Sequence, residues 1–173
     1  MKWIKDRLID RTFLKSPKPY IVQSLLAIVA VTIMLYFVEI LTHAAIVAAL
    51  GASVFIVFAM PNTIAADPRR IIGGHIIGVL CGILCYYVFC AGPIGGFFEA
   101  TEPIRWFPAA LSVGLAIFLM SIFNFEHPPA AGTAIGIVTH EWSHLTVIFV
   151  IVFAVSLAIV KVLLRKYLKD LYT

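Results

Sequence analysis

The stretch LTVIFVIVFAVSLAIVKVLL, residues 145–164, contains a single charged residue, Lys161. A helix of about 20 residues is about 30 Å long, which matches the hydrocarbon core of a bilayer. Of the 173 residues in the chain, 62% are hydrophobic and 13% are charged, whereas soluble domains are about 45–50% apolar and about 25% charged. The sequence therefore predicts an all-α integral membrane protein and excludes a water-soluble globule.

Five further apolar segments precede this stretch, and we expect each to form a helix. Their bounds are about 20–41, 43–60, 68–91, 107–125 and 130–139. Asp67 followed by Pro68 is typical of a helix N-cap and first turn, and Pro128 with Pro129 suits the start of another helix. The second segment ends at a Pro-Asn pair, and the fifth is too short to cross a ~30 Å core. The expected fold has about six transmembrane segments, two of them short or discontinuous.

The positions of Lys and Arg indicate the orientation, because these residues are retained on the cytoplasmic side of a membrane. If all six segments cross, the basic N-terminus, Arg69, Arg70 and the basic tail share one side, and Arg105 lies on the other. The net charge of +4 thus arises at the ends of apolar segments and does not indicate a nucleic-acid partner.

Three parts follow from this distribution. We expect a basic amphipathic cytoplasmic segment at 1–19, a single transmembrane domain at 20–164 and a cytoplasmic tail at 165–173. Both termini would face the cytoplasm, and the expected location is the inner (plasma) membrane of a prokaryotic cell. Membrane lipid would then surround the transmembrane domain.

Residues 20–92 and 107–164 each form a triplet of segments with a shortened middle member. An odd repeat unit is inverted relative to its copy, so the fold would be a 3+3 inverted repeat. Paired interrupted segments of this kind are typical of the central substrate site of a transporter. Small residues also recur at spacing four, which suggests a homo-oligomer.

Residues 126–133, EHPPAAGT, place ionisable side chains at the start of the short fifth segment. Free N–H groups and the positive dipole end of a helix N-terminus favour an anion, and a protonated His127 would add to both. The alternative is a structural Pro-Pro kink, with His127 hydrogen-bonded to a neighbouring carbonyl.

Residues 68–75, PRRIIGGH, form the second candidate. Arg69 would attract an anion from the cytoplasmic side, and His75 lies up to two helical turns deeper. The alternative is topological, because the arginines would also serve to hold the loop inside. Glycines recur at every fourth position from Gly74 to Gly82, which predicts close packing of another helix rather than a cavity.

Residues 140–144, HEWSH, match the HExxH pattern, in which two histidines one helical turn apart bind zinc and the glutamate acts as a base. The stretch lies between two apolar segments, and residues 145–160 contain no carboxylate that could be a third ligand. The three cysteines lie together in one apolar segment, as small packing residues would. We expect neither an enzyme nor a metal or cofactor, and the alternative function is a zinc-dependent intramembrane metalloprotease.

Several motifs occur together in this chain, namely Gly51-Ala52-Ser53, Pro61, Pro68-Arg69 followed by Gly73-Gly74-His75, and His127-Pro128-Pro129-Ala130. In this combination they resemble the HPP family of small integral membrane proteins. Together with their apolar segments, they cover residues 20–164. Plant plastid and cyanobacterial members of the family are nitrite transporters, so the resemblance implies transport of a small anion.

The chain departs from the family pattern in three respects. The family is usually described with four spans, whereas the charges here favour six segments. The pattern commonly has Asn where this chain has Arg70, and Ala-Gly-Ala where it has Ala130-Ala131-Gly132. Selectivity would differ accordingly.

The sequence therefore predicts a membrane transporter or channel for a small monovalent anion, with nitrite first. A histidine side chain is able to titrate near neutral pH, so His127 and His75 would couple the anion to a proton. A non-catalytic membrane scaffold is a third class of function. The residues expected to bind the anion are His127, Pro128, Pro129, Arg69, His75, Gly51, Ser53 and Thr133.

Overall fold

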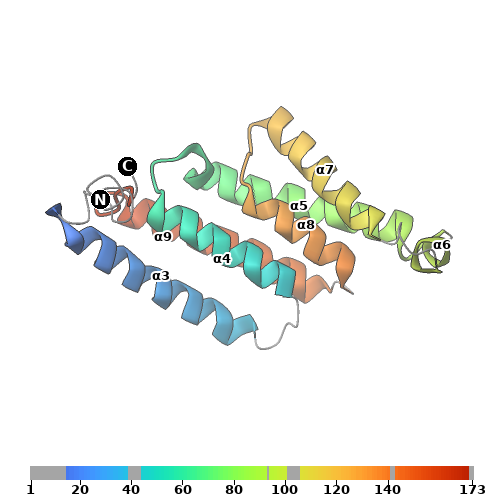
Figure 1. The fold of residues 1–173 in the computed structure, drawn as a ribbon, viewed down its shortest axis with the longest axis horizontal. Coiled ribbons are helices and arrows are strands. Elements are labelled where there is room, and N and C mark those ends of the chain that lie inside the picture. Colours follow the sequence, from blue (N-terminus) through green and yellow to red (C-terminus); the bar gives the residue numbers. More distant parts are fainter. Residues whose placement is uncertain (1–14, 39–43, 93, 101–105, 141–142, 172–173) are drawn as a thin grey trace, which may run out of the picture.

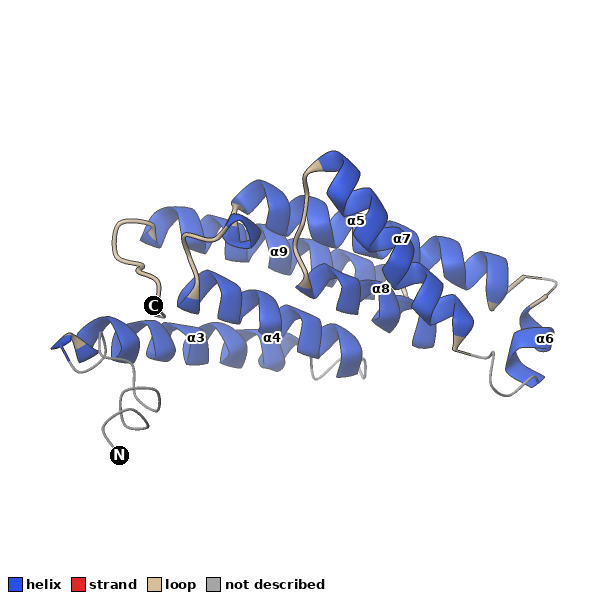
Figure 2. Cartoon of the chain, turned by 45° about the horizontal axis from the view of Figure 1, so that its top comes forward, coloured by secondary structure: helices blue, strands red, loops and turns tan. Residues whose placement is uncertain are grey.

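The computed structural model describes residues 15–38, 44–92, 94–100, 106–140 and 143–171. These residues form a bundle of α-helices and contain no strand (Figures 1 and 2). The elements are α3 (Pro17–Val38), α4 (Ala44–Ala59), the 3-10 turn η1 (Ile64–Ala66), α5 (Pro68–Phe89), α6 (Gly95–Ala100), α7 (Phe107–Phe123), α8 (Pro129–Thr139) and α9 (His144–Leu164). The predicted amphipathic segment falls mostly outside the described residues.

All six predicted segments are helical, which confirms the all-α prediction. Asp67 caps α5 as expected, since its side chain accepts a hydrogen bond from the Arg69 N–H at 2.9 Å. Helix α6 is a difference from the prediction, because it lies between the predicted segments 68–91 and 107–125, where no helix is predicted. The last four residues of α6, FFEA, contain no helix breaker, so the glycines before them do not prevent a short helix.

The outer surface of the bundle is apolar. Among the described residues, α5 and α9 are long and apolar enough to cross a membrane, while α4, α7 and α8 are apolar but shorter. Large apolar side chains such as Leu80, Phe118 and Val152 are more than half exposed. A soluble monomer does not present so much contiguous apolar surface to water. The protein is therefore an all-helical integral membrane protein.

The long helices alternate in direction. Figure 1 shows α3, α4, α5, α7, α8 and α9 running back and forth along the long axis, so that the start of α3 and the end of α9 lie at one end. The described Lys and Arg residues all belong to this basic end: Lys15, Lys18, Arg69, Arg70, Lys161, Arg165, Lys166 and Lys169. The structure therefore agrees with six segments and one-sided charge, while Arg105 lies outside the described residues.

Helix α8 lies between α4 and α5, and glycines allow the close approach on both sides. A Cβ atom on Gly74 would lie 2.7 Å from Cβ of His127, and one on Gly78 would collide with the Ala130 carbonyl. On the other face of α8, a Cβ atom on Gly136 would collide with Ile46 of α4. The prediction that the glycines of α5 pack against another helix is confirmed.

The residues after α9 fold back onto α3 and α4. The Gln23 side chain donates to the backbone carbonyls of Phe58 and Lys169 and accepts from the Lys169 N–H at 2.9 Å. Both carboxylate oxygens of Asp170 accept from Asn62, from its backbone N–H and its side-chain amide, each at 3.0 Å. These bonds join the tail to the basic end of the bundle.

Candidate functional site

Four polar side chains meet where α4, α5 and α8 pack together. They are Ser53 on α4, His75 on α5, His127 just before α8, and Thr133 on α8, and each is 0% exposed. We call these four residues the histidine cluster. Burying polar groups in a membrane-embedded bundle is costly, so such groups are retained where they are hydrogen-bonded and functional.

Every ring nitrogen in the histidine cluster has a partner. Ser53 Oγ lies 3.0 Å from Nε2 of His75 and 2.9 Å from Nε2 of His127. Nδ1 of His75 lies 2.9 Å from Oγ1 of Thr133, and Nδ1 of His127 lies 2.7 Å from the carbonyl oxygen of Ala65. The two rings meet edge to face, with centroids 5.2 Å apart. The cluster is a continuous hydrogen-bonded network through three helices.

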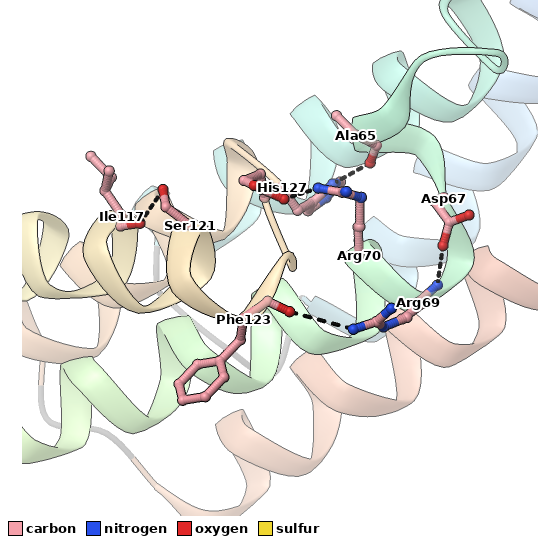
Figure 3. Close-up of polar contacts among 9 residues, drawn as sticks. Ala65, Asp67, Arg69, Arg70, Ile117, Ser121, Phe123 and His127 are labelled. Atoms are coloured by element: carbon pink, nitrogen blue, oxygen red, sulfur yellow. Dashed lines mark hydrogen bonds and ion pairs between the residues drawn. The ribbon is translucent and has the colours of Figure 1, made fainter.

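Local backbone features place the two histidines. His127 precedes a proline, which disfavours helical geometry at that position, so the chain turns there before α8 begins. Gly74 lacks a side chain and lets His127 approach α5 next to His75. The turn η1 presents the carbonyl of Ala65 to His127 from the opposite side (Figure 3).

The first turn of α8 does not offer the free N–H donors that the sequence suggested. Pro128 and Pro129 have no N–H. The N–H of Ala130 donates to the carbonyl of His127 at 2.9 Å, and that of Ala131 donates to the carbonyl of Pro128 at 3.1 Å. The expectation of unpaired N–H groups at these positions is wrong, and the donors of the site are side chains.

The side chains of Arg69 and Arg70 both contact the segment that connects the end of α7 to α8 (Figure 3). The guanidinium of Arg69 lies 4.8 Å from the ring centroid of Phe125 and donates to the carbonyl of Phe123 at 3.4 Å. Arg70 forms an ion pair with Glu126. Arg69 is exposed at the basic end, and the contacts described for its guanidinium are with Phe123 and Phe125 rather than with the histidine cluster.

Gly51 is not part of the site, although its neighbour Ser53 is central. A Cβ atom on Gly51 would have no heavy atom within 4 Å. Two residues along an α-helix point about 200° apart, so the two side-chain positions lie on opposite faces of α4. Pro128 is exposed at the start of α8, whereas Pro129 is buried.

Sequence reasoning missed two contributors to the site. The carbonyl of Ala65 has no signature in the sequence, because every residue has one. The partner of Arg70 could have been found, since Glu126 adjoins the histidine motif and carries the opposite charge.

The HEWSH stretch is not a continuous helix. Helix α8 ends at Thr139 and α9 begins at His144, so His140 and His144 belong to separate segments. Glu141 lies outside the described residues. The part of the chain that the structure describes contains no group of three or more His, Cys, Asp or Glu residues that could hold a metal ion.

Comparison with known proteins identifies the family. Residues 14–170 match the family described as HPP, transmembrane region. Over 90 residues, which are 52% of this chain, the sequence is 29% identical to a transmembrane protein of Dictyostelium discoideum, and the match covers 28% of that protein's length. No solved structure matches the chain. Because the family match extends over nearly every residue, the chain belongs to the HPP transmembrane family.

Proposed function

We propose that the protein transports a small monovalent anion across the membrane, and that nitrite is the first substrate to test. The observation that carries the proposal is the histidine cluster, which gathers hydroxyl and imidazole groups inside an otherwise apolar bundle. These groups can donate hydrogen bonds to an anion, and the imidazoles can also gain positive charge. The choice of nitrite as substrate rests on the family resemblance, because plant plastid and cyanobacterial relatives transport it.

The charges around the cluster favour an anion over a cation. Helices α4, α7 and α8 contain no Asp, Glu, Lys or Arg. The carboxylate nearest to the cluster along the chain, Glu126, is paired with Arg70. A cation in this position would find no free carboxylate on these helices, whereas an anion would find donors.

The positive charges at the basic end would attract the anion to this end of the bundle. Lys and Arg side chains attract anions over about one Debye length, roughly 8–10 Å in physiological salt. Arg69 adds its charge beside the linker that leads to His127. The anion would be drawn to this end and would then enter the bundle beside α8.

Proton coupling follows from the cost of burying charge. A protonated imidazole or a bare anion alone in this bundle is unfavourable, whereas the two together are close to neutral. We therefore expect the anion to bind together with one proton, as the sequence suggested for His127 and His75. The cluster is fully buried in this conformation, so loading requires the helices around it to open.

Purified protein in liposomes tests the transport proposal. We expect saturable nitrite uptake that exceeds uptake of chloride, and a nitrate series run in parallel measures selectivity. Arg69→Ala should lower the apparent affinity several-fold and reduce the dependence on salt, because it removes an attracting charge outside the cluster. Uptake of every tested anion at the rate of protein-free liposomes would contradict the proposal.

A further inference from the structure

The hydroxyl of Ser53 has more potential acceptors than it can serve at once. Its Oγ lies 2.9 Å from Nε2 of His127, 3.0 Å from Nε2 of His75 and 3.1 Å from the carbonyl oxygen of Ala49. A hydroxyl has one hydrogen and two lone pairs, so it donates to one partner and accepts from up to two. The partner that receives the hydrogen must therefore depend on which ring nitrogens are protonated.

When both rings are neutral, one carbonyl sets the direction of every bond. The oxygen of Ala65 can only accept, so Nδ1 of His127 carries the ring hydrogen. Nε2 of His127 must then accept the hydroxyl of Ser53. Ser53 in turn accepts from Nε2 of His75, and Nδ1 of His75 accepts from the hydroxyl of Thr133. The hydrogen bonds thus form a chain from Thr133 to Ala65 in which every group donates in the same direction.

One added proton changes this arrangement at a single point. A proton from water that binds Nε2 of His127 makes this nitrogen a donor to Ser53 Oγ. The Ser53 hydrogen then turns to the carbonyl of Ala49, and its oxygen accepts from both rings. Each ring nitrogen keeps a partner, so proton uptake costs the cluster no hydrogen bond.

We propose that His75, Ser53 and His127 form one proton-binding site, in which Ser53 is the switch that turns its hydroxyl from His127 to Ala49 when His127 is protonated. Ser53 is a positioning residue here, since it adjusts to the proton without keeping it. The step deepens the proposed function, because the site would supply the proton that accompanies the anion.

Among the described residues, α4, α7 and α8 provide no counter-charge for this proton, and the exposed carboxylate of Asp67 lies near Lys161 at the basic end. Arg70 and Glu126 neutralise each other, and α4, α7 and α8 carry no charged side chain. The titratable or charged side chains on the other segments packed around the cluster are Asp67, Arg69, Cys81, Cys85, Tyr86, Tyr87, His144 and Lys161. A small monovalent anion would supply the missing negative charge, which links the proton site to transport.

The test uses the full chain labelled with 15N-histidine in lipid nanodiscs. Imidazole 15N shifts report the tautomer and the protonation state of each ring, and the chain has only five histidines to assign. We expect neutral His127 to carry its hydrogen on Nδ1 and neutral His75 on Nε2. On acidification, the first proton that the pair takes up should appear on Nε2 of His127.

Substitutions at Ser53 test the switch. Ser53→Ala should lower the pH midpoint of His127 by about one unit, since it removes the Ser53 bond in both protonation states and the bond to the charged ring is the stronger of the two. Ser53→Thr keeps a hydroxyl and should restore the wild-type midpoint. Ser112→Ala is the matched control, because Ser112 is also fully buried and, among the described residues, its hydroxyl bonds the carbonyl of Ala109, at 2.7 Å, rather than the histidine cluster.

Two results would overturn this inference. The first is a neutral His127 that carries its hydrogen on Nε2. This measurement uses the wild-type protein alone. The second is an unchanged midpoint in Ser53→Ala. The titration requires no transport, so the expected tautomers and midpoint shift would support the proton site even where nitrite flux fails, and that failure would count against the transport proposal alone.

Discussion

Thr133 joins the histidine cluster through one atom. Its Oγ1 lies 2.9 Å from Nδ1 of His75, and the whole side chain is buried in α8. Valine has nearly the same shape as threonine but no hydroxyl, so the substitution separates the hydrogen bond from the packing. The ring nitrogen of His75 would be left buried without its partner.

Thr133→Val should therefore lower the free energy of unfolding by about 1–3 kcal/mol, the cost of an unsatisfied buried polar group. Denaturation of the purified protein in detergent measures this change. Thr139→Val removes an exposed hydroxyl from the end of the same helix and should have a small effect. Equal stabilities of the two variants would contradict the assigned role of Thr133.

Much of the residue-level site could be predicted, for identifiable reasons. His75, His127, Ser53 and Thr133 belong to motifs that combine polar side chains with apolar segments, and the structure brings all four together. Gly51 was expected in the site as part of the Gly51-Ala52-Ser53 stretch, but helical geometry places its side-chain position on the opposite face of α4 from Ser53. Contacts across the fold, such as the carbonyl of Ala65, depend on how η1 packs and have no local pattern.

Helices α5 and α8 pack closely against each other, because glycines of α5 face α8. A methyl group on Gly78 would meet the Ala130 carbonyl, whereas one on Gly51 would meet nothing within 4 Å. Gly78→Ala should lower the free energy of unfolding by about 1–3 kcal/mol through overpacking. Denaturation in detergent measures both variants. Gly51→Ala should leave the free energy of unfolding unchanged or raise it by up to about 1 kcal/mol. A Gly78→Ala variant with the wild-type free energy of unfolding would show that the α5–α8 contact is looser than described.

Helix α3 is tied to the chain end by one buried side chain. Gln23 is 1% exposed and bonds both the backbone N–H and the backbone carbonyl of Lys169. Gln23→Leu keeps the volume but removes these bonds, so the tail should detach and trypsin should cleave faster after Lys166 and Lys169. Ser24→Ala changes the exposed neighbour and is the control. Equal cleavage rates in the two variants would be inconsistent with this tie.

Helix positions were easier to predict than their packing. Length, apolar runs and the proline and Asp67 signals located α3, α4, α5, α7, α8 and α9, because those signals are local in the sequence. The fold-back of the tail could not be predicted, since it depends on residues such as Gln23 and Lys169 that are far apart in the chain.

For the whole molecule, the one-sided placement of Lys and Arg predicts which end faces the cytoplasm. A reporter fused to the C-terminus should be cytoplasmic, and one inserted at Gly96 in α6 should lie on the opposite side. Reporter activity in intact cells measures this orientation. Reporters on the same side would contradict six crossings.

The inverted repeat stays a prediction at this scale. Helix α4 packs against α8 and α5 against α9, which pairs the middle and last members of the two triplets, but α5 also packs extensively against α7, whereas the corresponding pair α9 and α3 has far fewer contacts. Helix α8 begins part of the way along α5, next to Gly74, so the cluster lies inside the bundle rather than at its end. This placement is typical of a transporter site.

We propose that the histidine cluster binds an anion together with a proton. The most direct measurement is the initial rate of nitrite uptake into proteoliposomes with and without an inward proton gradient. Protein-free liposomes give the background, because neutral nitrous acid crosses lipid unaided. We predict saturable uptake that the gradient accelerates, that His127→Ala abolishes and that Ser112→Ala leaves unchanged. Uptake at the background rate, or uptake unaffected by His127→Ala in a folded protein, would contradict the proposal that the histidine cluster binds an anion with a proton.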